Sequence, residues 1–327
     1  MSKNLSPTSP LLDIRDLRVV YLTAHGAVKA VDGVSLAIKP GEVLGLAGES
    51  GSGKSTLAHA ILRILHSPAL ITGGQAIFAG RDIMEMDDPE LERFRWKDIS
   101  IVFQSAMNSL NPVMRIRDQL QDVMLHHGLS KTEANERAIN LFHLVGIEPR
   151  RLDSYPHQLS GGMRQRVVIA IALALNPPML IMDEPTTALD VVVQKDILQQ
   201  IASLREKMGF SILFITHDLS LLVEVSTHIA IMYAGEVIEQ ARAHELFENA
   251  LHPYTVGLMN SFPSISGDKH KLTGIPGSPP DLVTPPPGCR FHPRCPKVMP
   301  ICSQTTPMTR TISADHSVAC HLYQESL

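Results

Sequence analysis

Apolar and polar side chains alternate over the first part of the chain. The alternation covers residues 11–45 and is interrupted by turn signals at His25-Gly26, Asp32-Gly33 and Pro40-Gly41. A period of two is typical of strands that bury one face. The pattern therefore predicts an antiparallel β-layer, and Gly73-Gly74 is expected to open a further β segment.

Four short apolar runs differ from this alternation because they hold almost no polar side chains. They cover residues 43–47, 99–103, 179–182 and 211–216. Runs of this length are typical of strands that are buried on both faces of a sheet. Helical patterns lie between them, and strands that alternate with helices predict an α/β core with a mostly parallel sheet. The ligands of such sheets bind at the carboxyl ends of the strands.

Residues 113–150 have a helical pattern that is rich in polar side chains. Ser130 and Glu133 have the spacing of a capping box, in which each side chain accepts a hydrogen bond from the other residue's N–H. The helix that follows should end at Gly146 and bury one stripe of side chains. The stripe consists of Ala138, Leu141, Phe142 and Val145. The other predicted elements are a helix that starts at Asp88-Pro89 and a hairpin of residues 229–233 and 237–239.

One glycine-rich segment lies between the run at 43–47 and the helical pattern after it. Its sequence is Gly48-Glu49-Ser50-Gly51-Ser52-Gly53-Lys54-Ser55-Thr56, which fits the P-loop pattern G-x-x-x-x-G-K-[ST]. Glycines let the backbone N–H groups point at an anion, and the helix N-terminus adds its positive end. Lys54 can reach the β- and γ-phosphates, and the Ser55 hydroxyl can bind Mg²⁺. The segment therefore predicts a site for a nucleotide and Mg²⁺.

Polar residues follow the other predicted buried strands. Gln104 suits a metal or a water, and Asp183 suits a supporting contact near Mg²⁺. Glu184 can polarise a water for attack on the γ-phosphate, and His217 can contact that phosphate or orient the water. The amides of Ser160-Gly161-Gly162, before a helical pattern, suit an anion. Each residue also has an ordinary explanation, which is solvation for the four side chains and a glycine helix cap for the last segment.

Composition excludes several functional classes. The chain has 327 residues, a hydrophobic fraction of 44% and a formal net charge of −4. This charge gives no indication of nucleic-acid or lipid-surface binding. No apolar run approaches the ~18 residues of a membrane span. Residues 1–10 are rich in Ser and Pro and lack the apolar core of a signal peptide, so we expect a disordered tail and a cytoplasmic location.

All four cysteines lie near the C-terminus. They are Cys289, Cys295, Cys302 and Cys320. The segment before them, residues 261–288, is rich in Pro, Gly and Ser and predicts an arm without regular structure. In a reducing compartment four clustered thiols suit zinc or an iron–sulfur cluster better than disulfides, although the C-x₂-C knuckle of structural zinc sites is absent. Three nearby histidines are alternative ligands that we expect to be solvated: His292, His316 and His321.

The order and spacing of these segments resemble those of ATP-binding cassette (ABC) ATPases over roughly residues 11–250. The matching motifs are Walker A at Gly48–Thr56, the Q-loop at Gln104, the signature at Leu159–Met163, Walker B at Leu180–Glu184, the D-loop at Ala188–Asp190 and the H-loop at His217. The resemblance implies that Tyr21, which by spacing alone is equally suited to packing within the sheet, stacks on adenine. It also implies that two cassettes enclose two ATP molecules, so that Ser160–Gly162 contact the ATP of a partner.

The C-terminal part resembles the ATPases of oligopeptide and dipeptide importers. The segments that carry this resemblance are Tyr155–Gly162, Pro185–Asp190, His252–Thr255 and Gly288–Pro296. It implies a peripheral subunit on the cytoplasmic face of the membrane, which pairs with a second, related ATPase subunit beneath two membrane subunits. An extracytoplasmic binding protein delivers the solute, most often a peptide. Some members with this tail hold a [4Fe–4S] cluster, which favours that cluster at the four cysteines over the two alternatives, zinc and free or disulfide-linked thiols.

Together these observations predict three regions. Residues 1–10 form a tail; residues 11–260 form an ABC nucleotide-binding domain with an antiparallel β-subdomain and a helical subdomain at about 105–165; residues 261–327 form an irregular, cysteine-containing extension. The predicted function is ATP hydrolysis that energises an importer. One alternative is a soluble ABC ATPase of translation or DNA repair, although such proteins usually carry two cassettes or a long coiled coil. The other is an exporter ATPase, against which the tail argues.

Overall fold

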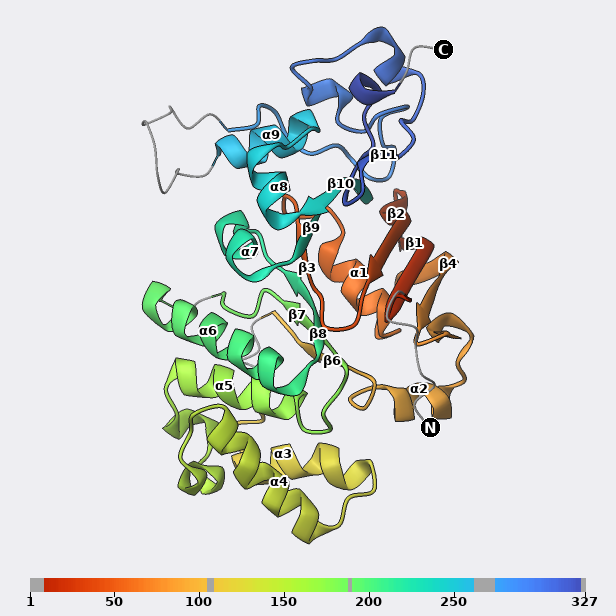
Figure 1. Ribbon diagram of the computed structural model, residues 1–327. Coiled ribbons are helices and arrows are strands. Elements are labelled where there is room, and N and C mark those ends of the chain that lie inside the picture. The colour runs from red at the N-terminus through yellow and green to blue at the C-terminus, as the bar shows by residue number, and fades with distance from the viewer. Residues whose placement is uncertain (1–8, 105–108, 188–189, 262–273, 325–327) are drawn as a thin grey trace. The chain divides into compact units, whose positions relative to one another are not determined.

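A computed structural model describes residues 9–104, 109–187, 190–261 and 274–324 (Figure 1). The chain divides into two compact units. The first contains the described residues of Met1–Ile38, Val43–Met84 and Ile215–Leu327, and the second contains those of Lys39–Glu42 and Glu85–Phe214. Most of the predicted tail over residues 1–10 lies outside the described residues.

The first unit contains a four-stranded antiparallel sheet with the order β2-β1-β4-β5. Its strands are β1 (Leu12–Thr23), β2 (Gly26–Ile38), β4 (Ala69–Phe78) and β5 (Arg81–Asp82). Buried and exposed side chains alternate along much of β1 and β2, which confirms the predicted β-layer. Two predictions are wrong: Asp32-Gly33 is not a turn but lies within β2, and Gly73-Gly74 does not open a β segment but lies within β4. The register with β1 shifts near both positions, and bulges of this kind let a strand continue past an extra residue.

A second group of strands in this unit positions the glycine-rich segment. β3 (Val43–Ala47) is buried at every residue and pairs in parallel with β9 (His228–Tyr233), which forms an antiparallel hairpin with β10 (Glu236–Arg242). The predicted buried strand and the predicted hairpin are therefore confirmed. The helices of this unit are α1 (Lys54–Ile61), α7 (Leu219–Val225), α8 (Ala243–Glu248) and α9 (Pro253–Asn260). α1 packs on β1 and β2, and α7 packs on β3.

The C-terminal extension is more regular than the sequence predicts. Residues 274–291 contain no helix or strand, as expected for the arm. Beyond them, β11 (Arg310–Ser313) and β12 (His316–Val318) form a hairpin, and β12 pairs with β10. The extension, which was predicted to be irregular, thus contains one short hairpin, because the free edge of β10 accepts a further strand.

The second unit contains a parallel pair of strands, β6 (Ile99–Val102) and β7 (Met179–Asp183), with β8 (Ser211–Ile215) next to β7. The last residue of β8 belongs to the first unit. All residues of the three strands are buried, as the apolar runs predict. The helices are α2 (Asp88–Phe94), α3 (Ile116–His126), α4 (Lys131–Leu144), α5 (Gly161–Ala172) and α6 (Val191–Met208). α3 and α4 lie side by side (Figure 1).

The predicted start of α4 is confirmed in detail. The Ser130 hydroxyl accepts from the Glu133 backbone N–H at 3.3 Å, and the Glu133 carboxylate accepts from the Ser130 backbone N–H at 2.8 Å. This reciprocal pair satisfies two N–H groups that the helix itself leaves without partners. The four residues of the predicted apolar stripe are all buried.

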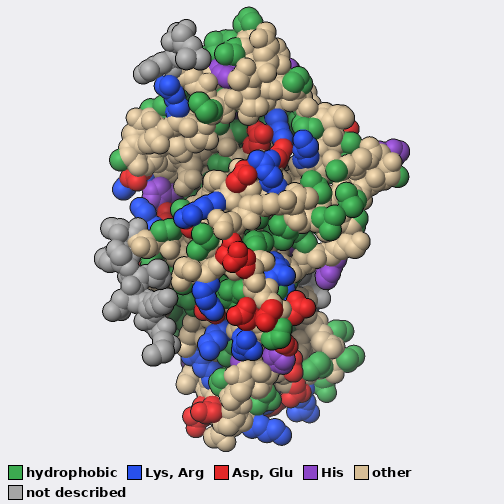
Figure 2. Space-filling model, turned by 90° about the vertical axis from the view of Figure 1, so that its right-hand side faces the viewer, with side chains coloured by type: hydrophobic (Ala, Val, Ile, Leu, Met, Phe, Trp, Pro, Cys, Tyr) green, Lys and Arg blue, Asp and Glu red, His purple; other side chains and the backbone are tan. Residues whose placement is uncertain are grey.

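The distribution of charged side chains on the surface is consistent with the small net charge of the chain. Acidic and basic side chains are interspersed on the face drawn in Figure 2. Among the described residues, no helix combines the length and the apolar composition that crossing a membrane requires.

A buried ionic contact joins the C-terminal extension to the hairpin of β9 and β10. The His316 side chain is 3% exposed, and its Nε2 lies 2.8 Å from the Glu239 carboxylate. Its Nδ1 lies 3.2 Å from the carboxylate of Glu245. Glu239 also accepts from the backbone N–H groups of Leu251 at 2.7 Å and His252 at 2.9 Å. The hydrogen bond to Glu239 is the main reason why the pKa of His316 is raised above its usual 6.5.

This contact predicts a pH-dependent contribution of His316 to stability. Because the folded-state pKa is raised, the contribution is complete below pH 6.5 and is lost as the pH rises through the folded-state pKa. We expect His316→Gln to destabilise the first unit by about 2–3 kcal/mol at about pH 5.5 and by less at about pH 8.5. Calorimetry at the two pH values measures the difference.

The control is His244→Gln, because the ion pair of His244 with Glu248 is exposed and is expected to contribute little. Equal destabilisation by His316→Gln at both pH values would contradict the assignment of a charged pair.

Candidate active site

The glycine-rich segment connects β3 to α1 in a tight curl. Gly48 and Gly53 have φ angles of 150° and 105°. A Cβ atom on Gly48 would lie 2.1 Å from the Met232 carbonyl oxygen, and one on Gly53 would lie 2.1 Å from the Ala30 carbonyl oxygen. Both positions therefore require glycine, and the loop is wrapped against the neighbouring backbone.

Lys54 lies inside this curl and is 7% exposed. Its Nζ donates to the carbonyl oxygens of Gly48 at 2.8 Å and Glu49 at 2.9 Å, and to the Ser52 hydroxyl at 3.2 Å. The loop thus holds a buried positive charge at the N-terminus of α1, where the helix dipole also favours an anion. This arrangement fits the phosphates of a nucleotide.

Two further candidate residues belong to the same unit. Tyr21, on β1, is half-buried, and its hydroxyl lies 3.2 Å from the Thr56 hydroxyl at the start of α1. His217 is exposed and comes two residues after β8. Asp218, directly after it, accepts from the Ser220 N–H at 3.0 Å and caps α7, so the position of His217 is fixed by a capped helix.

The second unit contains the other strand-end residues. Val102 of β6 pairs with Met182 of β7 in parallel, and Gln104 and Glu184 each lie two residues beyond this pair. The side chain of Asp183, between Met182 and Glu184, is buried.

Glu184 has an unusual backbone conformation. Its φ is 48°, a region that non-glycine residues occupy rarely and that is common at functional sites. Its carboxylate accepts from the Thr187 hydroxyl at 2.8 Å. The chain therefore turns sharply at the carboxyl end of β7 and holds this carboxylate at the turn.

The serine-glycine segment forms the N-terminus of α5. The Ser160 hydroxyl accepts from the Met163 N–H at 3.3 Å, and Gly161 and Gly162 form the first turn. Asp190 caps α6 in the same way, accepting from the Val193 N–H at 3.0 Å. Ala188 and Leu189 of the predicted D-loop lie outside the described residues.

Sequence reasoning missed a contact between the loop and the C-terminal extension. The Glu49 carboxylate lies 2.7 Å from a guanidinium nitrogen of Arg294, and its backbone N–H donates to the Tyr254 hydroxyl at 2.8 Å. Arg294 is 245 residues away in the chain, and no spacing pattern connects it to the loop.

The four cysteines are close enough to affect one another. None of them is in a disulfide. Burial raises the pKa of Cys289 to about 12, and the charges of the other three thiols add to this effect. In the described part of the chain, however, no group of three or more His, Cys, Asp or Glu side chains is placed to hold a metal ion. Zinc requires all its ligands within ~2.3 Å of one point, so the geometry does not support the zinc alternative.

The nearby histidines were expected to be solvated, and for two of them this was wrong. His316 and His321 are buried. His321 Nε2 lies 2.7 Å from the Thr305 carbonyl oxygen, and His316 contacts Glu239. Both imidazoles therefore have protein partners that stabilise their burial.

Comparison with known families agrees with this site. The family described as "ABC transporter" matches residues 31–187, which include the phosphate loop and Glu184. The family described as "Oligopeptide/dipeptide transporter, C-terminal region" matches residues 238–302, which include Arg294 and three of the four cysteines.

Curated relatives are similar over almost the whole chain. The dipeptide transport ATP-binding protein DppD of Caldanaerobacter subterraneus is 42% identical over 97% of this chain and 98% of its own length. The oligopeptide transport ATP-binding protein OppD of Salmonella typhimurium is 43% identical over 92% of this chain and 91% of its own.

A solved structure is similar in fold. The ATP-binding cassette MJ0796, in a dimeric post-hydrolysis state bound to ADP and phosphate, superposes with a TM-score of 0.63 and 31% identity. It covers 71% of this chain and 98% of its own. The chain therefore belongs to the ABC transporter ATPases and, within them, to the ATP-binding subunits of oligopeptide and dipeptide transporters.

Proposed function

We propose that this chain hydrolyses ATP to energise the import of dipeptides, oligopeptides or a related solute. The observation that carries the proposal is the similarity to the dipeptide transport ATP-binding protein over 97% of the chain. The curled loop around Lys54 adds a phosphate site that the reaction requires.

The proposed roles follow from the ABC ATPase motif that each residue matches. Lys54 and the loop amides hold the phosphates, and Ser55, Gln104 and Asp183 are the residues assigned to Mg²⁺. When bound, Mg²⁺ offsets the charge on the phosphate oxygens. Catalysis then depends mainly on positioning and charge stabilisation.

The remaining roles concern the attacking water and the nucleotide's other contacts. Glu184 acts on the water, and His217 holds the γ-phosphate in line. Tyr21 stacks on adenine. By the resemblance to ABC ATPases, Ser160–Gly162 contact the ATP of a partner cassette. The N-terminus of α5, where they lie, favours an anion.

Glu184→Gln should bind ATP with unchanged affinity and hydrolyse it ~100-fold or more slowly, because the amide lacks the basicity to accept a proton from water. Phosphate release and nucleotide binding measure the two effects. Glu206→Gln, an exposed site on α6, is the matched control. Hydrolysis by Glu184→Gln at the rate of the control would remove Glu184 from this role.

The proposed assembly places the chain on the cytoplasmic face of the membrane. It pairs with a second ABC ATPase subunit beneath two membrane subunits, and a binding protein supplies the solute. A mild-detergent pull-down from native membranes tests this: two polytopic proteins and a second P-loop ATPase are expected. Recovery of ribosomal or repair proteins alone would contradict the transport function and leave the ATPase chemistry intact.

We also propose that the four cysteines hold a [4Fe–4S] cluster that braces the extension. Such a cluster spaces its thiolate ligands farther apart than a single ion does, and four cysteines are its usual ligand set. The backbone N–H of Cys289 donates to the carbonyl oxygen of Cys302 at 2.8 Å, which brings two of the four cysteines together.

Protein purified without oxygen is expected to contain about four irons and four sulfides per chain. Cys302→Ser should lower both, whereas Ser303→Ala, at the exposed neighbouring residue, should lower neither. Iron and sulfide near zero in the wild-type protein would overturn the proposal.

A further inference from the structure

A buried arginine of the C-terminal extension forms an ion pair with a residue of the phosphate loop. The Arg294 side chain is 6% exposed, and two of its nitrogens lie 2.7 and 2.9 Å from the two carboxylate oxygens of Glu49. This is the bidentate geometry in which arginine binds a carboxylate most strongly. Glu49 is the second residue of the loop, directly after Gly48.

The remaining contacts of Arg294 fix its own position. Its Nε donates to the Pro276 carbonyl oxygen at 2.8 Å, and Nη1 donates to the Tyr233 hydroxyl at 3.3 Å. The guanidinium carbon also lies 5.8 Å from the centre of the Tyr233 ring and 6.0 Å from that of Phe291. The contacts with Pro276 of the arm, with Tyr233 of β9 and with Phe291 therefore orient the guanidinium toward Glu49.

Glu49 is held at three points and passes this constraint to Lys54. Arg294 binds the carboxylate of Glu49, and the Tyr254 hydroxyl accepts from the backbone N–H of Glu49 at 2.8 Å. The carbonyl oxygen of Glu49 accepts from Lys54 Nζ at 2.9 Å. Tyr254 is itself fully buried against Tyr233 and Phe291, with ring centres 4.6 and 5.4 Å away. Glu49 is therefore the one residue that connects Arg294 to the amine of Lys54.

We propose that Arg294 is a positioning residue for the ATPase reaction, and that the extension thereby sets the ATP affinity of the phosphate loop. Arg294 acts through Glu49, whose carbonyl oxygen orients the amine of Lys54. The proposal requires only the ATPase activity and not the identity of the transported solute.

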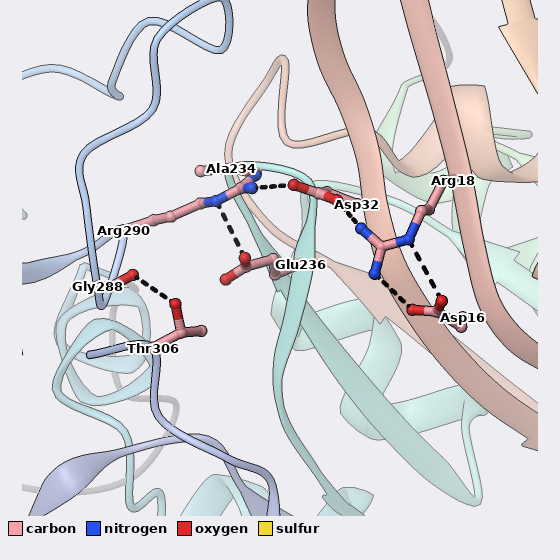
Figure 3. A network of polar contacts seen from close by, with 8 residues as sticks. All are labelled: Asp16, Arg18, Asp32, Ala234, Glu236, Gly288, Arg290 and Thr306. Carbon is pink, nitrogen blue, oxygen red and sulfur yellow. Dashed lines mark hydrogen bonds and ion pairs between the residues drawn. The ribbon is translucent and has the colours of Figure 1, made fainter. Parts of the chain in front are cut away.

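A second buried arginine of the same extension serves as a matched control. Arg290 is 7% exposed and contacts Asp32, Glu236 and the carbonyl oxygen of Ala234, as Figure 3 shows. Asp32 also pairs with Arg18. This network lines a cleft of about 540 Å³, and no residue of the phosphate loop is among the described residues that line it. Arg290 and Arg294 thus both anchor the extension, but only Arg294 contacts the loop.

The experiment compares Arg294→Gln with Arg290→Gln in the purified transporter complex. A correctly positioned loop stabilises bound ATP equally in the ground state and in the transition state. Loss of the contact should therefore raise KM roughly tenfold and change kcat little. Arg294→Lys, which keeps the charge and loses the bidentate geometry, should recover part of the affinity. Arg290→Gln should lower Tm and leave KM unchanged.

Direct binding of a fluorescent ATP analogue to the full-length chain separates this proposal from the transport function. The same weakening by Arg294→Gln is expected there without any partner. Glu49→Gln removes the contact from the loop side, so Glu49→Gln with Arg294→Gln should weaken binding no more than either change alone. An unchanged affinity in Arg294→Gln, additive losses in the double variant, or an equal loss in Arg290→Gln would each overturn the proposal.

Discussion

The curl of the backbone around Lys54 is the interaction on which the rest of the molecule depends. The curl needs glycine at two positions because neighbouring carbonyl oxygens lie where a Cβ atom would be. It also needs a fully buried strand, β3, to present it and a helix, α1, to follow it. The pairing of β3 with β9 and the packing of α1 on β1 and β2 make the first unit a rigid support for a phosphate site.

The C-terminal extension is joined to the sheet and to the phosphate loop by buried charged side chains. Buried charged contacts attach it to the rest of the first unit: Arg290 to Asp32 and Glu236, Arg294 to Glu49, and His316 to Glu239. Such contacts stabilise the structure only when both partners are present, because a single buried charge is costly. An extension that has little core of its own is thereby held in one position.

Much of the fold could be predicted from the sequence because local pattern and tertiary environment agree. The buried strands, the capping box at Ser130 and the apolar stripe of α4 are of this kind. The bulges near Gly33 and Gly74 could not be predicted, because a glycine signals a turn or a bulge equally well. The strand β12 was missed because its pairing depends on a free edge of β10, distant in sequence.

Some parts of the candidate site could likewise be predicted from the sequence, and others could not. The loop, Glu184 and the cap at Ser160 are local motifs, so their positions follow from the sequence. The contact of Arg294 with Glu49 joins residues 245 positions apart, and no periodicity carries that information. Long-range side-chain pairs of this kind become visible only when the chain is folded.

The most direct test of the account is peptide uptake by the complex reconstituted in lipid vesicles, with ATP supplied on the side of this chain. Wild-type complex should accumulate labelled peptide only when ATP is present. With Lys54→Ala in this chain, uptake should fall to the level without ATP, because the phosphates lose their buried cation. Undiminished uptake by Lys54→Ala would contradict the claim that ATP bound at this loop drives transport.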